Sequence, residues 1–226
     1  MIVSKDYSAS SATEDYVKAI YKMESRRRGA VSTNALAAQL GLTASSASGM
    51  VRKLADAALV EHVPYRGVRL TESGRRLALA VLRRHRLLEL YLTEALGMSW
   101  DRVHDHAEVL EHALSAELEE LIADKLGDPV RDPHGDPIPT RDGLVIEEPT
   151  QSLADLEVGA MGRLVRVSDS DPEMLRHLTS CGVSLGDQVE VLEWQPFGGG
   201  VLVRFADQMH CISRELAGAM RVELWA

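Results

Sequence analysis

A run of imidazole and carboxylate side chains at helical spacing is the feature that most constrains this chain. Between residues 104 and 112, a helix would align four such side chains along one stripe: His104, Glu108, Glu111 and His112. A second pair, His85 and Glu89, lies one helical turn apart upstream. Two helices that each offer imidazole and carboxylate on one face can enclose a divalent cation. The two stripes together favour a metal site over a solvated face on which His and Glu fall together by chance.

The formal net charge of −9 is divided unevenly along the chain. Residues 1–88 carry 15 Lys and Arg against 7 Asp and Glu, a charge of +8, whereas the remainder carries 10 against 27, a charge of −17. A positive first part favours contact with a polyanion, for which nucleic acid is the obvious candidate. Screening acts over about 8 Å at physiological salt, so the acidic remainder would oppose this contact little.

The chain of 226 residues is long enough for two or three domains. Its first residues show no basic start followed by an apolar run, and no stretch approaches the roughly 18 apolar residues of a membrane-spanning helix. We therefore expect a cytoplasmic protein with no membrane partner. The two cysteines, Cys181 and Cys211, form no Cys-x-x-Cys pair, which argues against a disulfide framework and a thiolate zinc site.

The positive segment has the pattern of a winged helix-turn-helix. Apolar spacing predicts helices from Thr13 to about Arg26, after a cap at Ser32 or Thr33 until Gly41, and from about Ser45 to Ala58. Residues 59–70 then predict a hairpin with a basic tip, the wing. The second helix of such a pair faces the major groove. The candidate DNA contacts are Thr43, Ser45, Ser46, Ser48, Lys53, Arg66 and Arg69, with helix capping or a solvated face as the alternative for each.

The rest of the chain predicts a helical part and a small β part. Long helices are expected over 71–98 and from about Trp100 to Leu126, the second long and apolar enough for a dimer interface. Residues 127–150, rich in Pro, Asp and Gly, are interpreted as a linker. Short strands at 162–167, 188–192, 200–205 and 220–224 are typical of a small β-barrel. We thus expect a mainly α chain with a small β domain, divided into domains 1–74, 75–150 and 151–226.

Six segments, in their order and spacing, carry a resemblance to a known family: EDYVKAIY at 14–21, YRGVRLTESG at 65–74, RRHRLLELYL at 83–92, VHDHAEVLEH at 103–112, GDPIP at 135–139 and VSLGDQVEVLE at 183–193. Over essentially its whole length the chain resembles the metal-dependent transcription factors of the diphtheria toxin repressor and manganese transport regulator family. The resemblance implies a winged-helix domain, a helical dimerisation and metal-binding domain, and a C-terminal SH3-like (FeoA-like) barrel. It also implies a homodimer that binds palindromic double-stranded operator DNA when loaded with divalent metal, and that represses genes of metal homeostasis.

Carried over residue by residue, the resemblance implies two metal sites. The primary site would use Asp15, Glu108, Glu111 and His112. The ancillary site would use His85, Glu89 and His104, completed by a carboxylate of the barrel, first Asp171 and next Glu173. His106 points elsewhere on a helix and is interpreted as a surface histidine.

Three departures from the family pattern bear on the metal. Iron-responsive members carry Met and Cys where this chain has Asp15 and Glu108, and carboxylates in place of sulfur favour a harder cation such as Mn²⁺. Manganese-type members usually place Glu where this chain has Lys18, and Met174 stands where iron regulators supply an amide. Mn²⁺ is therefore the first choice and Fe²⁺ is close behind, with Zn²⁺ or Co²⁺ able to substitute in vitro.

Three other functions remain as alternatives. The first is an iron-dependent regulator of the same family. A metallohydrolase could use the same His and carboxylate side chains with an activated water, but the sequence has no nucleophile elbow, phosphate loop or His-Glu-x-x-His motif, so we expect no enzyme. A winged-helix regulator of thiol oxidation would need cysteines in a basic neighbourhood, which Cys181 and Cys211 lack.

Overall fold

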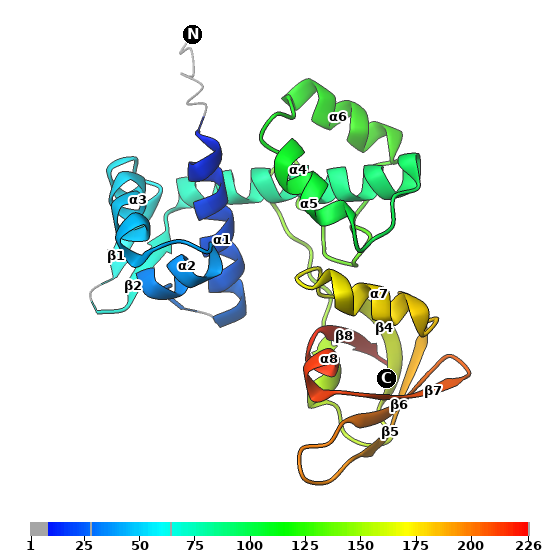
Figure 1. Cartoon of the computed structure of the whole chain (residues 1–226). Helices are drawn as coiled ribbons and strands as arrows, with labels where there is room; N and C mark the ends of the chain where they lie inside the picture. Colours follow the sequence, from blue (N-terminus) through cyan, green and yellow to red (C-terminus); the bar gives the residue numbers. More distant parts are fainter. Residues whose placement is uncertain (1–8, 28, 64, 226) are drawn as a thin grey trace. The chain divides into compact units, whose positions relative to one another are not determined.

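The computed structural model describes residues 9–27, 29–63 and 65–225, and these form two compact units (Figure 1). The first unit contains the described residues up to 84 together with residues 111–113 and 139–144. The second contains residues 85–110, 114–138 and 145–225. Helix α4 (Glu72–Leu96) is continuous and contributes residues to both units. No described helix combines the length and the apolar character that crossing a membrane requires.

The first unit is a winged helix-turn-helix, as the sequence predicts. Its elements follow in the order α1 (Ser11–Arg27), α2 (Thr33–Gln39), α3 (Ala44–Asp56), β1 (Val60–Val63) and β2 (Gly67–Leu70). Two hydroxyl caps set the helix starts, because Ser32 accepts the amide N–H of Ala35 and Thr43 accepts that of Ser46. Buried apolar side chains from these elements form one core that includes Val17, Ile20, Leu36, Leu54 and Val68.

The helical part of the second unit differs from the sequence prediction at one point. The single helix expected from about Trp100 to Leu126 is two helices, α5 (Val103–Leu110) and α6 (Ala116–Lys125). The break has a local cause, because Ser115 takes the N-cap position of α6 and its side chain accepts the amide N–H of Leu118. A cap residue has extended backbone, so the chain must leave the helix before Ser115. Residues 111–113 consequently form a turn.

The segment expected to be a linker contains a packed loop. Asp132 accepts the amide N–H groups of His134 and Asp136, each at 2.9 Å, and this closes a turn between Arg131 and Pro137. At Gly135, φ is +85° and an added Cβ would lie 2.0 Å from the carbonyl oxygen of Val165. Asp132 and His134 are both buried. The side chains of both residues therefore lie in the interior of the second unit.

The C-terminal part is a six-stranded antiparallel sheet in the order β3-β8-β4-β5-β6-β7. The strands are β3 (Gln151–Ser152), β4 (Met161–Val167), β5 (Gln188–Trp194), β6 (Val201–Phe205), β7 (Gln208–Ile212) and β8 (Met220–Leu224). The four predicted strands correspond to β4, β5, β6 and β8. The short helices η1 (Leu153–Asp155), α7 (Pro172–Ser180) and α8 (Arg214–Gly218), together with β3 and β7, were not predicted from the sequence.

A glycine at the start of the wing gives a first test of the fold. At Gly67, φ is +112° and an added Cβ would lie 2.0 Å from the carbonyl oxygen of Val31. Gly67→Ala should therefore destabilise the wing by roughly 2 kcal/mol more than Gly41→Ala, where φ is +64° but no atom lies within 4 Å. Hydrogen exchange of the Val31 and Val68 amides, which bond each other's carbonyls, measures the difference. Equal protection in the two variants would contradict the steric argument.

Candidate metal centres and nucleic-acid interface

Three of the four residues predicted for the primary site lie together in the first unit. Asp15 on α1 and the turn residues Glu111 and His112 each offer one ligand atom within 4.8 Å of the others, and we call them the primary cluster. Asp15 Oδ1 is 3.0 Å and Glu111 Oε1 is 3.6 Å from His112 Nε2. Glu111 is fully buried, whereas the Asp15 side chain is 41% exposed, so solvent reaches the cluster from one side.

Two charged neighbours of the primary cluster hold its side chains in place. His112 Nδ1 donates to Glu14 Oε2 at 2.6 Å, and Glu14 Oε1 accepts from Arg84 at 2.7 Å. This pairing leaves Nε2 of His112 for a ligand, which is the arrangement that metal-binding histidines usually have. Lys18, which is 5% exposed, forms an ion pair with Glu111. The sequence reasoning missed Glu14, although it directly precedes Asp15.

The predicted fourth ligand, Glu108, belongs to the second unit. It lies on α5, where its Oε1 is 3.6 Å from His104 Nε2. The sequence predicted one helical stripe for Glu108, Glu111 and His112, but α5 ends at Leu110. The stripe is therefore divided between a helix and the following turn.

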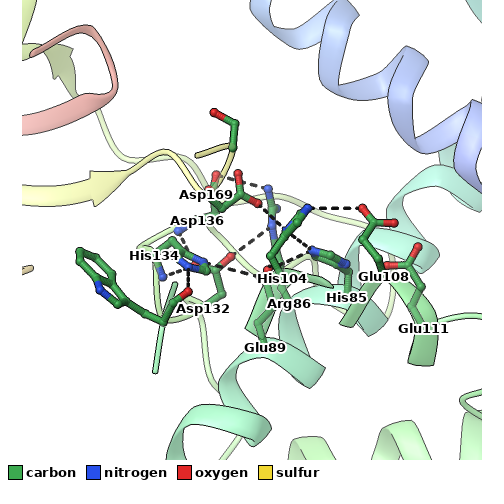
Figure 2. A network of polar contacts seen from close by, with 12 residues as sticks. His85, Arg86, Glu89, His104, Glu108, Glu111, Asp132, His134, Asp136 and Asp169 are labelled. Atoms are coloured by element: carbon green, nitrogen blue, oxygen red, sulfur yellow. Dashed lines mark hydrogen bonds and ion pairs between the residues drawn. The ribbon is translucent and has the colours of Figure 1, made fainter. Parts of the chain in front are cut away.

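The second unit contains the residues predicted for the ancillary site (Figure 2). Glu89 Oε1 is 3.1 Å from both His85 Nε2 and His104 Nδ1. The carboxylate of Asp169 is also 3.1 Å from His104 Nδ1. We call these four residues the ancillary cluster, because each offers a ligand atom within 4.8 Å of the others.

The barrel carboxylate in this cluster is Asp169, whereas the sequence pointed to Asp171 and then to Glu173. Asp171 is instead the N-cap of α7, and its Oδ1 accepts the amide N–H groups of Glu173 and Met174. Glu173 is exposed in the first turn of that helix, 4.0 Å from Arg176. Asp followed by Pro is a typical helix start, so the sequence did carry a signal for this cap.

Burial and charge act against each other in the ancillary cluster. Burial opposes protonation of His104, but hydrogen bonds to Asp169 and Glu89 and the charges of both outweigh it, which raises the pKa of His104 to about 10. Burial likewise opposes ionisation of Glu89, but the charge of His85 and hydrogen bonds from its histidine neighbours hold the pKa of Glu89 well below its usual range. The carboxylate is thus ionised, and the protons that compensate its charge include the one on His104. A divalent cation could replace those protons.

The candidate DNA-contact residues lie on α3 and on the wing. Ser45, Ser46, Ser48 and Lys53 are exposed on α3, and Arg66 and Arg69 are exposed on the hairpin. Capping, the alternative considered for these residues, holds for Thr43, whose side chain caps α3. The Ser48 hydroxyl donates to the carbonyl of Ala44 within the helix. The sequence reasoning missed Tyr65 at the hairpin tip, which is fully exposed and has a φ of +60°.

Apolar side chains are exposed on α5 and α6. Val109 and Leu110 on α5 are 73% and 43% exposed, and Leu118 and Leu121 on α6 are 47% and 58% exposed. Groups of exposed apolar side chains of this kind commonly mark protein–protein contacts. This is the surface that the sequence predicts for dimerisation.

Three family models together match nearly the whole chain. Residues 9–68 match the N-terminal DNA-binding domain of the iron-dependent repressors. Residues 71–140 match the metal-binding and dimerisation domain of the same repressors, and residues 151–224 match the FeoA domain.

Relatives and solved structures of similar length agree with these matches. The diphtheria toxin repressor of Corynebacterium glutamicum is 33% identical over 93% of this chain and 95% of its own length. The iron-dependent repressor IdeR of Mycobacterium tuberculosis is 30% identical over 93% and 96%. Among solved structures, a manganese-dependent transcriptional repressor in complex with manganese is 45% identical, with a TM-score of 0.89 over 94% of this chain and 100% of that chain. The manganese regulator SloR is 30% identical, with a TM-score of 0.78 over 94% and 98%.

The exposed apolar surface gives a prediction about assembly. Replacing both Leu118 and Leu121 by Glu should weaken the homodimer about thirtyfold or more, since truncating a central interface residue typically costs about 2 kcal/mol. Sedimentation velocity over a dilution series measures the change. Leu144→Glu is the control. Leu144 is 65% exposed and lies outside α5 and α6, so this variant should leave the dimer intact. An unchanged dimer in the double variant would place the interface on another surface.

Proposed function

Since this chain belongs to the family of metal-dependent transcriptional repressors that includes the diphtheria toxin repressor, we propose that Mn²⁺ at the primary cluster activates its homodimer to bind a palindromic operator. The observation that carries the proposal is the convergence of Asp15, Glu111 and His112 in the first unit. The family consists of DNA-binding regulators. The regulated genes are proposed to be those of manganese and iron homeostasis.

The residues of the primary cluster fit a divalent cation. Two carboxylates and one imidazole nitrogen form a donor set that suits Mn²⁺ and Fe²⁺. The Glu14 carboxylate fixes the ring of His112, as neighbouring carboxylates commonly do for metal-binding histidines. When bound, the ion supplies a fixed positive charge that holds three side chains in one arrangement.

The mechanism follows from where these residues lie along the chain. Asp15 is on the first helix of the DNA-binding unit, whereas Glu111 and His112 form the connection between α5 and α6. Holding this connection against α1 restricts the movement of the recognition helix α3 with respect to the dimerisation helices. Binding to two operator half-sites requires a fixed spacing between two recognition helices, so metal shifts the population toward the form that binds DNA. By reciprocity, operator DNA tightens metal binding by the same factor, typically about 5- to 150-fold.

The choice of Mn²⁺ over Fe²⁺ rests on ligand chemistry and on similarity. Asp15 and the predicted ligand Glu108 are carboxylates where iron-responsive members carry sulfur, and oxygen ligands favour the harder ion. The solved repressor that is 45% identical was determined with manganese. Fe²⁺ is the alternative, supported by the iron-dependent repressors among the relatives. Zn²⁺ and Co²⁺ should also bind in vitro.

The ancillary cluster is proposed as a second ion site, with His85, Glu89, His104 and Asp169 as ligands. The DNA contacts are proposed to come from Ser45, Ser46, Ser48 and Lys53 on α3 and from Arg66 and Arg69 on the wing. Thr43 takes part through its cap at the start of α3.

DNA selection with the intact protein tests the proposed function. In the presence of Mn²⁺, the protein should enrich a palindromic sequence from a pool of random duplexes, and fluorescence anisotropy should show that chelator abolishes binding to it. Titration with Mn²⁺ and, without oxygen, with Fe²⁺ ranks the two ions. Asp15→Ala should reduce DNA affinity to the level seen with chelator while the dimer stays folded, because the cluster loses one of its three ligands.

Asp142→Ala is the matched control, since Asp142 is an exposed carboxylate of the same unit that lies outside the cluster. It should respond to Mn²⁺ as the unaltered protein does. A full metal response in Asp15→Ala would refute the proposed role of the primary cluster. Binding that does not depend on metal would redirect the search to another signal.

Lys18 generates a prediction about metal affinity. Its ammonium group pairs with Glu111 and thus competes with an ion for that carboxylate. Lys18→Met should tighten Mn²⁺ binding at the primary cluster at least about tenfold, since removing a nearby like charge at an effective dielectric constant near 20 gains more than about 1.4 kcal/mol. Isothermal titration calorimetry measures the change.

Lys22→Met, one helical turn further along α1, is the control for the loss of a positive charge. It should change Mn²⁺ affinity much less. Unchanged or weaker binding in Lys18→Met would show that Lys18 holds Glu111 in the geometry that the ion requires.

A further inference from the structure

One glycine on helix α3 (Figure 1) has no explanation in the fold of the protein. Gly49 lies in the interior of this helix, where glycine lowers stability relative to alanine because its backbone loses more conformational freedom on folding. Two circumstances account for other glycines of the described chain. These are a positive φ, as at Gly41 and Gly97, and a lack of room for a Cβ, as at Gly74 and Gly162. Neither circumstance applies to Gly49.

The space in front of Gly49 is open. The residue has helical backbone, and no heavy atom of the described residues outside the adjoining helix lies within 4 Å of a Cβ added there. Alanine would therefore fit at this position and would favour the helix. The remaining physical use of a glycine is to let another molecule approach the backbone closely.

Gly49 faces directly away from the core of its unit. Successive residues of a helix are about 100° apart, so the buried Ala47 and Val51 each lie about 160° around the helix from Gly49. Ser45, one turn before Gly49, and Lys53, one turn after it, are exposed and lie within about 40° of it. Gly49 is thus at the centre of the outward face of α3.

The side chains around Gly49 suit contact with DNA. Residues 44–53 contain three serines and the exposed cations Arg52 and Lys53, but no carboxylate. A serine hydroxyl is short and reaches a base edge only when the helix lies deep in the major groove, whereas a long cationic side chain reaches phosphates from further away. Residues 9–68 match a DNA-binding domain, so DNA is the molecule expected to approach this face.

We propose that Gly49 is the point of closest approach between α3 and the major groove of the operator. Its missing side chain lets the helix lie deep enough for the hydroxyls of Ser45 and Ser48 to reach base edges. Arg52, about one turn further along, then meets the phosphate backbone. The inference rests on the DNA contacts proposed for α3 and goes beyond them, because it assigns a role to the absence of a side chain. Gly49 is a positioning residue that sets the depth of the helix.

Larger side chains at position 49 separate this role from a role in folding. Gly49→Ala should weaken binding to the duplex selected with Mn²⁺ about tenfold, the value of a good base contact, and Gly49→Leu should weaken it further because its side chain is larger. Fluorescence anisotropy measures both. Hydrogen exchange of the α3 amides should be slower or unchanged in both variants, since alanine and leucine favour the helix more than glycine does. A purely structural role would not change affinity and helix stability in opposite directions.

The salt dependence of binding gives a second readout. Gly49→Ala removes no charge, so it should leave the slope of log affinity against log salt unchanged, and it should affect random duplexes, which are held mainly through phosphates, much less than the selected one. Arg52→Gln should instead reduce the slope by about one and weaken binding to any duplex. Gly218→Ala is the matched control, because Gly218 ends helix α8 of the β domain and an added Cβ there also has no atom within 4 Å. It should alter neither affinity nor slope.

The outcomes distinguish this inference from the proposed function. Equal affinity of Gly49→Ala and the unaltered protein for the selected duplex would overturn the inference, and so would an equal loss with selected and random duplexes. If Gly49→Ala weakens binding that ignores metal, the inference stands and the proposed function fails. If binding requires Mn²⁺ but Gly49→Ala leaves it unchanged, the proposed function stands and the inference fails. A pool from which no duplex is enriched would contradict both.

Discussion

Glu89 is a carboxylate without access to solvent, and much of the second unit is arranged to compensate its charge. Removing an ion from water costs several kcal/mol unless partners surround it. Here the partners come from α4, α5 and the loop after α6, and Asp169 of the β domain joins through His104.

Protons compensate the charge of Glu89 when no metal is bound. Despite burial, hydrogen bonds to Asp169 and Glu89 and the charges of both raise the pKa of His104 to about 10. The charges of Glu89 and Asp132, with the hydrogen bond to the Trp100 carbonyl, raise the pKa of His134 to about 9. Burial, together with the charges of Glu89 and Asp136, raises the pKa of Asp132 to about 7.

The primary cluster also contains a buried carboxylate, but its charge is compensated in another way. Glu111 is paired with the ammonium group of Lys18, which is part of the chain and does not dissociate as a metal ion does. Glu111 is therefore compensated with or without metal, while Asp15 remains partly exposed. A site of this kind can exchange its ion with solvent without leaving a bare charge in the interior, which suits a sensor. The ancillary cluster contains more buried groups and draws them from several segments, which would suit an ion that stabilises the fold.

The periodicity of the sequence predicted the winged helix, α4 and four of the strands, because their apolar faces follow the local repeat of helix and strand. It failed where a local cap or a tertiary contact decides. Ser115 ends the predicted long helix through one side-chain hydrogen bond, and that break moves Glu111 and His112 out of the expected stripe. The resemblance pointed to Asp171 and then to Glu173 as the barrel carboxylate, but Asp171 caps α7 and the carboxylate beside His104 is that of Asp169. The loop around His134 has the composition of a linker, and only packing reveals that its polar residues are buried.

Helix α4 places a residue that supports the primary cluster next to a residue of the ancillary cluster. Arg84 holds Glu14 and, through it, His112, whereas the next residue, His85, contacts Glu89. Neighbouring helical residues point about 100° apart, so the two side chains serve different sites without competing for space. The helix is continuous across both positions and is therefore stiff between them. Any coupling between the two clusters through this helix would operate equally in both directions, as linkage requires.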